Sequence, residues 1–224
     1  MTLRTSADRA IQGVLFDFHN TLVHLAPTAK WIASVGGQDL APARRELLAD
    51  VLSTVWARAD ARWPGSPWDL TPAAHRQAFT VILQEDGGCS QSTADRFYDV
   101  MPNQWLLAPG AGRLLTDLRR SGMKLGVISN IGIDIRPTLE VFGILELLDA
   151  VVLSFEVGMV KPDPNIFRHA AHALGLRPAQ CLMVGDTPAA DGAASRTGMT
   201  ALVVPMDVNG PRLELVAVLC RSDG

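Results

Sequence analysis

Five residues capable of hydrolytic chemistry or metal binding each follow a short apolar segment of the chain. They are Asp17, Ser129, Lys161, Asp186 and Asp191. Ligands of open parallel sheets bind at the carboxyl ends of the strands, so side chains that follow different strands can meet at one edge. The carboxylates of Asp17 and Asp186 can hold Mg²⁺, which prefers oxygen ligands. Ser129 and Lys161 can bind phosphoryl oxygens, and Lys161 can offset transition-state charge. Asp17 is then free to attack phosphorus and form an aspartyl-phosphate.

The apolar segments themselves predict a sheet. They are residues 11–16 (IQGVLF), 124–129 (KLGVIS), 150–153 (AVVL), 181–184 (CLMV) and 201–204 (ALVV). Short apolar runs without polar alternation are typical of strands that are buried on both faces of a parallel sheet. Segments with helical spacing separate the later runs, at 110–121, 134–142, 164–174 and 191–198. This alternation predicts an α/β fold with a doubly wound parallel sheet of five or more strands.

Residues 25–105 interrupt the strand–helix alternation. Their amphipathic pattern predicts one helix near 41–62, a second after Thr71-Pro72 and a third near 92–101. A helical domain over 25–105 is therefore expected to be inserted into a core formed by 1–24 and 106–224.

The bulk composition indicates an ordinary globular protein. Of 224 residues, 48% are hydrophobic and the net charge is −3, so bulk charge gives no reason to expect binding to nucleic acid or to an anionic membrane. The N-terminal segment contains Arg4, Asp8 and Arg9, which argues against a signal peptide or a membrane span. Three widely spaced cysteines favour reduced thiols in the cytoplasm. The sequence does not specify an oligomeric state.

The motifs as an ordered set resemble the haloacid dehalogenase superfamily, whose members are mostly phosphatases. The matching motifs are Asp17-Phe18-His19-Asn20-Thr21, Ser129-Asn130, Lys161-Pro162 and Gly185-Asp186 followed by Asp191. The stretches VISNIGIDIRPTL and SFEVGMVKPDPNIF are also similar to that family. The helical insert falls where the family's type-1 cap belongs. The resemblance implies a Rossmann-like catalytic core with a cap domain.

The resemblance also implies a role for each motif residue. Asp17 would be the nucleophile, and Lys161 would orient it. The metal ligands of Mg²⁺ would be Asp17, the backbone carbonyl of His19, Asp186 and, directly or through water, Asp191. The substrate-binding set would be Thr21, Ser129, Asn130 and Lys161, with Thr21 supporting the nucleophile loop. The expected activity is Mg²⁺-dependent hydrolysis of a small phosphorylated metabolite in the cytoplasm.

His19 departs from the family pattern. Phosphatases of the family carry at this position a second Asp, which protonates the leaving oxygen and then activates water. Three interpretations compete. In the first, histidine is the catalytic acid and base, because its ordinary pKa of about 6.5 suits both tasks. In the second, the chain is a hydrolytic dehalogenase, since family dehalogenases also lack that Asp, although they need no metal. In the third, the chain is a catalytically weakened relative that binds ligands.

The tryptophans are concentrated in the insert. All five lie between residues 31 and 105, as does the single tyrosine, Tyr98. Most of these rings are expected to form the core of a small helical domain. The segment Trp63-Pro-Gly-Ser-Pro-Trp68 has two prolines and a glycine, which favour a rigid loop, and it is the candidate specificity or lid loop.

Overall fold

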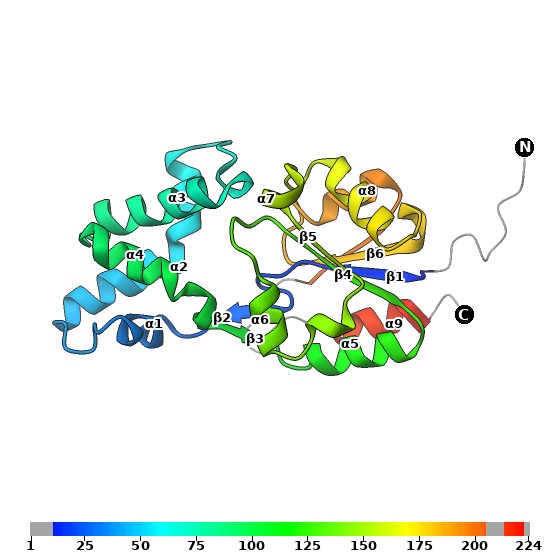
Figure 1. Ribbon diagram of the computed structural model, residues 1–224, viewed down its shortest axis with the longest axis horizontal. Helices are drawn as coiled ribbons and strands as arrows, with labels where there is room; N and C mark the ends of the chain where they lie inside the picture. The colour runs from blue at the N-terminus through cyan, green and yellow to red at the C-terminus, as the bar shows by residue number, and fades with distance from the viewer. Residues whose placement is uncertain (1–10, 205–212, 222–224) are drawn as a thin grey trace, which may run out of the picture. The chain divides into compact units, whose positions relative to one another are not determined.

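The computed structural model describes residues 11–204 and 213–221. The described residues form two compact units (Figure 1). The first, the sheet unit, comprises the described parts of Met1–His24, Leu107–Asn130 and Arg136–Gly224. The second, the helical unit, comprises Leu25–Leu106 and Ile131–Ile135.

The sheet unit contains five parallel strands in the order β5-β4-β1-β6-β7. Their bounds are β1 (Gly13–Phe16), β4 (Lys124–Ser129), β5 (Ala150–Leu153), β6 (Cys181–Gly185) and β7 (Thr200–Val203). Phe16 pairs with Val127 of β4 and with Val184 of β6. This register brings the ends of three strands to the same level, so the residues that follow them share one edge of the sheet. The predicted doubly wound α/β fold is confirmed.

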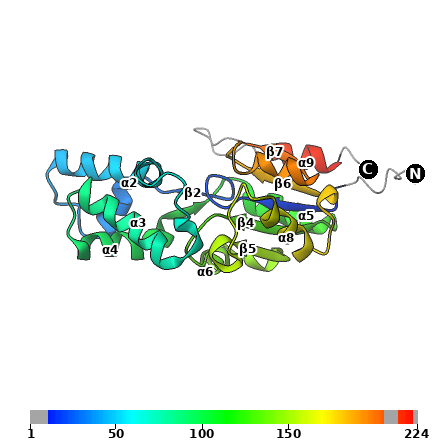
Figure 2. The ribbon, with the colours of Figure 1, turned by 90° about the horizontal axis from the view of Figure 1, so that it is seen from above.

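Helices cover both faces of the sheet. α8 (Pro164–Ala173) lies over one face, and α5 (Ala111–Arg120) and α9 (Glu214–Arg221) lie over the other (Figures 1 and 2). Leu15, Ile128 and Met183 of the strands pack with Ile166 and Phe167 of α8 in a buried cluster. The remaining elements are α6 (Arg136–Val141), α7 (Ser154–Val157), η4 (Leu145–Leu147), η5 (Pro178–Gln180) and η6 (Gly192–Thr197). The helix expected over 191–198 is thus a 3-10 helix, η6.

The helical unit contains the three helices that the sequence predicts. They are α2 (Pro42–Arg62), α3 (Pro72–Glu85) and α4 (Gln91–Asp99). The start of α3 follows from its sequence, because the Thr71 side chain accepts a hydrogen bond from the Ala74 N–H and Pro72 occupies the first turn. The other elements are α1 (Thr28–Ser34), η2 (Trp68–Leu70) and η3 (Met101–Gln104). The paired strands β2 (Val23–Leu25) and β3 (Trp105–Leu107) lie where the chain passes between the units.

Residues Ile131–Ile135 differ from the sequence expectation, which grouped all of 106–224 with the sheet. They belong to the helical unit instead. Gly132 explains the difference, since a Cβ there would lie 2.8 Å from Cγ of His75 and 3.1 Å from the Thr71 carbonyl oxygen. The missing side chain of glycine therefore permits a close approach of this segment to the start of α3.

An aromatic cluster forms the core of the helical unit. The Trp31 indole donates a hydrogen bond to the Phe97 carbonyl oxygen at 3.1 Å, and its ring stacks with Phe79 at 5.8 Å. His75 lies within the same cluster, with its ring centroid 4.3 Å from that of Trp56. The His75 Nδ1 is 2.8 Å from the Tyr98 hydroxyl. Most of the aromatic side chains of the insert thus serve its own core.

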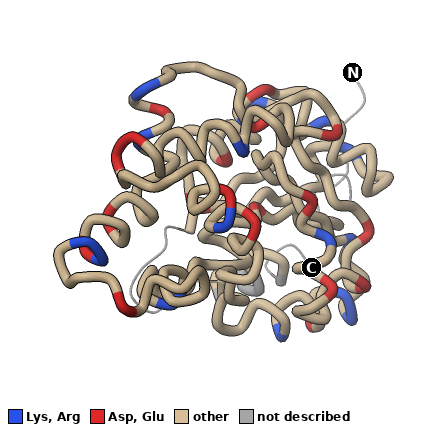
Figure 3. Tube along the Cα trace, turned by 60° about the vertical axis from the view of Figure 1, so that its left-hand side comes forward, with Lys and Arg blue, Asp and Glu red and all other residues tan. Residues whose placement is uncertain are grey.

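No helix within 11–204 or 213–221 is long and apolar enough to cross a membrane. Acidic and basic residues are interspersed along the trace (Figure 3).

We predict that the helical unit loses stability as the pH falls below 6.5. Burial among aromatic rings lowers the pKa of His75 from 6.5 to about 3, so the folded chain keeps the imidazole neutral. The unfolded chain binds a proton there below its ordinary pKa. The contribution of His75 to the free energy of unfolding is therefore fully present above pH 6.5. It is lost towards pH 3 at up to about 1.4 kcal/mol per pH unit. Tryptophan fluorescence during urea unfolding measures this loss, because all five tryptophans lie between residues 31 and 105.

Two histidine variants separate the loss of stability due to protonation of His75 from a general sensitivity of the protein to acid. His75→Gln should flatten the pH dependence, whereas His169→Gln, at an exposed position of α8, should keep it. An unchanged pH dependence in His75→Gln would contradict the assignment to this side chain.

Candidate active site

The loop after β1 is a tight turn that fixes the backbone of Asp17. The Asp17 N–H donates to the Val184 carbonyl oxygen at 2.8 Å. The N–H groups of Leu22 and Val23 both donate to the Phe18 carbonyl oxygen, at 2.9 and 3.0 Å. Asn20 adopts a left-handed backbone with φ of 61°, a conformation that asparagine tolerates better than most residues. This turn presents Asp17 at the carboxyl end of the central strand.

Lys161 joins two carboxylates in the interior of the sheet unit. Its Nζ donates to Asp17 Oδ1 at 2.5 Å and to Asp191 Oδ1 at 2.6 Å. The side chains of Lys161, Asp17 and Asp191 are only 3%, 10% and 2% exposed. Buried charges require such pairing, because removal from water is costly for an isolated ion. The contact therefore fixes the nucleophile candidate and its two partners as one group.

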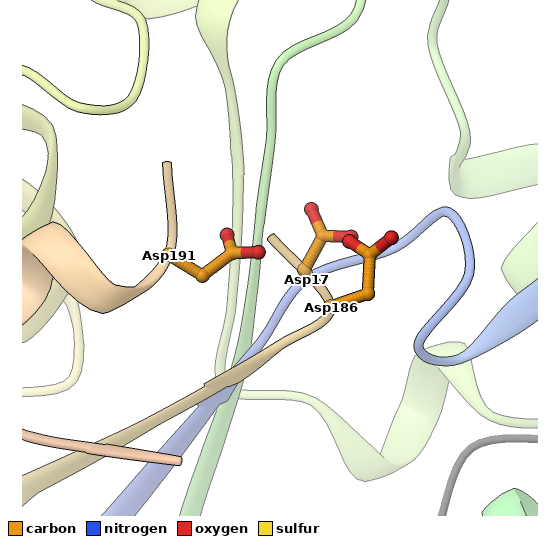
Figure 4. Close-up of side chains that lie close together, drawn as sticks. All are labelled: Asp17, Asp186 and Asp191. Atoms are coloured by element: carbon orange, nitrogen blue, oxygen red, sulfur yellow. The ribbon is translucent and has the colours of Figure 1, made fainter. Parts of the chain in front are cut away.

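Asp186 adds a third carboxylate to this group (Figure 4). One ligand atom from each of Asp17, Asp186 and Asp191 lies within 4.8 Å of the others. Desolvation raises the pKa of Asp17 to about 6, Lys161 opposes the rise, and Asp191 and Asp186 add to it. Three carboxylates face one ammonium among the described residues, so the ionised cluster carries a net charge of −2.

The donor set of this cluster suits a hard divalent cation. All three groups offer carboxylate oxygens, which are the ligands that Mg²⁺ and Ca²⁺ prefer. A divalent ion would also neutralise the residual charge. The structure thus brings together three of the residues that the sequence named as metal ligands, Asp17, Asp186 and Asp191, and their role as ligands stays a prediction.

Asn130 contacts the backbone of Lys161 through both ends of its side-chain amide. Its Nδ2 donates to the Lys161 carbonyl oxygen at 2.9 Å, and its Oδ1 accepts from the Lys161 N–H at 2.7 Å. The sequence placed Asn130 in the substrate-binding set. In the structure its side chain holds the Lys161 backbone, and its role in substrate binding stays a prediction.

Ser129 and Thr21 are both buried near the same edge. Ser129 ends β4 and is 2% exposed, and Thr21 is fully buried in the loop after β1. The Thr21 hydroxyl has no hydrogen-bond partner among the described residues. The structure thus places both residues in the sheet unit with the carboxylate cluster, and their predicted roles in substrate binding remain predictions.

His19 lies in the loop after β1 and is partly buried. Burial lowers its pKa from 6.5, Asp186 opposes the shift, and His24 adds to it. The imidazole is therefore mainly neutral near pH 7, which suits a base better than an acid. His24, whose Nδ1 is buried without a partner among the described residues, is an electrostatic neighbour that the sequence did not reveal.

Two further positioning contacts escaped the sequence analysis. The Asn20 Nδ2 donates to Asp186 Oδ2 at 3.3 Å, and the Thr187 N–H donates to Asp191 Oδ2 at 3.0 Å. Gly185 also matters, because a Cβ there would lie 2.5 Å from the Cβ of Asp191. The Gly-Asp pair that ends β6 is therefore a packing requirement for Asp191 as well as a source of Asp186.

Comparison with known proteins agrees with this geometry. The model of the haloacid dehalogenase-like hydrolases matches residues 11–197. The chain belongs to this hydrolase family. A phosphoserine phosphatase of Thermus thermophilus is 33% identical over 175 residues, which are 76% of this chain and 65% of that protein. The chain spans 65%, 51% and 41% of the length of three curated relatives that it matches.

Solved structures of a phosphatase and of a dehalogenase both share the fold of this chain. A phosphatase of the family from Thermococcus onnurineus has a TM-score of 0.63 and 22% identity, with 93% of this chain and 98% of that chain covered. The L-2-haloacid dehalogenase from Xanthobacter autotrophicus has a TM-score of 0.62 and 22% identity, with 88% and 78% covered. The fold alone is thus compatible with phosphate and halide chemistry, and the side chains must decide between them.

We predict that Gly185→Ala weakens divalent metal binding by about 10- to 100-fold, the usual effect of displacing a group that orients a ligand. The added methyl group would collide with the Asp191 side chain and move its carboxylate. Calorimetric titration with Mg²⁺ measures the affinity, and circular dichroism confirms that the variant is folded.

Gly192→Ala is the matched control. A Cβ at Gly192 would meet only Val203 Cγ2, at an ordinary 3.7 Å, so metal affinity should equal that of the parent chain. Parent-like affinity in folded Gly185→Ala would show that Asp191 does not contribute to the metal site.

Proposed function

We propose that this chain is a Mg²⁺-dependent phosphomonoester hydrolase that forms an aspartyl-phosphate on Asp17. The observation that carries the proposal is the cluster of three carboxylates and one ammonium, of which only Asp186 is partly exposed, with its residual charge of −2. We also propose that residues 25–105 are the cap domain and that 1–24 with 106–224 form the catalytic core. The compartment that we propose is the cytoplasm, on the basis of cysteine usage.

The proposed reaction has two displacements at phosphorus. In the first, a carboxylate oxygen of Asp17 attacks phosphorus, the bond to the leaving oxygen breaks, and the leaving group takes up a proton. In the second, water attacks phosphorus of the aspartyl-phosphate, loses a proton and releases phosphate and the free Asp17 carboxylate. Bound Mg²⁺ would supply Lewis-acid stabilisation of the phosphoryl oxygens.

The residues around Asp17 support each part of this reaction. Lys161, bonded to Asp17 and Asp191, holds the nucleophile in place and contributes positive charge for the phosphoryl group. Asn130 fixes the Lys161 backbone. Ser129 and the buried Thr21 hydroxyl are the proposed further donors for the phosphoryl group, and Asp186 and Asp191 would hold the metal with Asp17 and the His19 carbonyl.

His19 is the proposed acid and base in place of the family's second Asp. Its lowered pKa leaves the imidazole unprotonated near pH 7, so the ring is available to accept a proton from water in the second displacement. The same shift makes the protonated form scarce in the first displacement. We therefore expect the enzyme to favour substrates whose leaving group needs little protonation.

The substrate class that we propose is a small phosphorylated metabolite. The similarity to a phosphoserine phosphatase supports this class. Hydrolytic dehalogenation is the second candidate, because an L-2-haloacid dehalogenase shares the fold. The carboxylate cluster favours phosphate chemistry, since displacement of a halide needs neither a metal nor a proton for the leaving group.

We predict that Asp17→Asn lowers the rate of phosphate release from 4-nitrophenyl phosphate by at least about 10³-fold, because the amide cannot act as the nucleophile. The assay is run with Mg²⁺ and with EDTA, and EDTA should abolish the parent activity. Asp117→Asn, at a half-exposed position of α5, should retain the parent rate.

Other outcomes would support the alternatives. Metal-independent halide release from a 2-haloacid would identify a dehalogenase. Mg²⁺ binding without turnover on a broad panel of phosphate esters would identify a binding protein. Parent-like phosphate release by Asp17→Asn would contradict the proposed nucleophile.

We predict that His19→Asp preserves or raises the rate, most clearly on alkyl phosphates, whose leaving groups need a proton. His19→Ala should lower the rate by about 10²-fold, with the largest loss on alkyl phosphates. The measurement compares kcat on aryl and alkyl phosphates, with the exposed His172→Ala as control. Equal rates of His19→Ala and the parent chain on alkyl phosphates would exclude an acid–base role for His19.

A further inference from the structure

A cavity of about 360 Å³ lies within the helical unit, and none of its lining residues takes part in the proposed chemistry. Leu48 of α2 and Phe97 of α4 contribute buried apolar surface to it. Arg44 and Arg96 lie at the same cavity, together with Cys89. The cavity is thus lined by apolar side chains and by two arginine residues, which is a composition expected for a site that binds an amphipathic anion.

Arg44 is held in place by the turn between α3 and α4. Its Nη2 donates to the Gly88 carbonyl oxygen at 2.9 Å. Gly88 has a positive φ of 56°, and a Cβ there would lie 3.2 Å from Arg44 Nη1. A guanidinium has five N–H donors, so the bond to Gly88 and the longer one to Cys89 Sγ leave Arg44 with donors for another acceptor.

The charge balance of the helical unit sets these arginines apart. Three other arginines of α2 and α3 form ion pairs with carboxylates: Arg58 with Asp50 and Asp86, Arg62 with Glu85 and Asp86, and Arg76 with Asp95 and Asp99. Among the residues that the structure describes, no carboxylate lies within 4.0 Å of the Arg44 or Arg96 guanidinium, whereas carboxylates are close to the other three. Two cations without carboxylate partners therefore share one cavity.

Cys89 adds a local reporter to the cavity. Its Sγ is 4.0 Å from Arg44 Nη2, and its side chain is half-buried. Desolvation raises the pKa of its thiol, and Arg44 opposes the rise. The thiol is thus mainly neutral near pH 7, and a ligand in the cavity would limit the access of an alkylating reagent to it.

We propose that this cavity binds a small organic anion, whose carboxylate or phosphonate-type oxygens are held by Arg44 and Arg96 and whose apolar body packs on Leu48 and Phe97. Guanidinium groups bind such oxygens through paired, charge-assisted hydrogen bonds. The site is independent of the proposed hydrolysis, since none of its residues belongs to the Asp17 group.

The test measures alkylation of Cys89 by iodoacetamide, followed by peptide mass spectrometry. Benzoate and phenylphosphonate are the anionic probes, and benzyl alcohol is the neutral probe of similar size. Saturable protection of Cys89 by an anionic probe, with none by benzyl alcohol, is the expected result. The two anionic probes distinguish a carboxylate site from a phosphonate site. Absence of protection by both would overturn the proposal.

Variants test whether Arg44 and Arg96 bind the anionic probe that protects Cys89. Arg44→Gln and Arg96→Gln should each raise the half-protecting concentration about tenfold, as expected for loss of a charge-assisted hydrogen bond. Arg45→Gln is the matched control, because Arg45 follows Arg44 in the first turn of α2, donates to the Gln38 carbonyl oxygen and does not line the cavity. Circular dichroism verifies folding. The assignment of the anion site to Arg44 and Arg96 would be contradicted by either of two results. One is a loss of protection in Arg45→Gln as large as that in Arg44→Gln, and the other is parent-like protection in Arg96→Gln.

Discussion

The contact on which the rest of the site depends is the buried ammonium of Lys161 between Asp17 and Asp191. A lysine that is 3% exposed would lose its charge without such partners, and two buried carboxylates would be neutralised without it. Because Asp186 adds a further carboxylate, the ionised group keeps a net negative charge that Lys161 does not neutralise. Burial is the main cause of the raised pKa of Asp17, and the like charges of Asp191 and Asp186 add to it. A divalent ion would complete the balance and leave Asp17 ionised for nucleophilic attack.

The fold provides this contact by bringing together segments that are far apart in the sequence. Parallel pairing of β1 with β4 and β6 places Asp17, Ser129 and Asp186 at one edge. Asn130 then fixes the Lys161 backbone, and Gly185 leaves space for Asp191. Each of these supporting residues acts on the geometry of a charged group. The sheet therefore determines which side chains meet, and the loops determine how closely they meet.

The sequence predicted the strands and the shared edge because buried parallel strands have a simple signature and their ends must coincide. It also predicted α2, α3 and α4 from their apolar spacing and from Thr71-Pro72. It did not reveal the double contact of Asn130 with Lys161 or the bond from Asn20 to Asp186, because both depend on loop conformations that no periodic pattern encodes. The grouping of Ile131–Ile135 with the helical unit depends on the close approach of Gly132 to His75, which is a tertiary feature. The short strands β2 and β3 have only three residues each, too few to show a pattern.

Covalent trapping on Asp17 tests the central claim most directly. The protein is quenched with acid during turnover of an aryl phosphate in the presence of Mg²⁺, reduced with borohydride and digested for peptide mass spectrometry. An aspartyl-phosphate is an acyl phosphate, which borohydride reduces, so the account predicts conversion of Asp17 to homoserine only when both substrate and Mg²⁺ are present. The account would be contradicted if the protein released phosphate in the presence of Mg²⁺ while Asp17 stayed unmodified in every quenched sample.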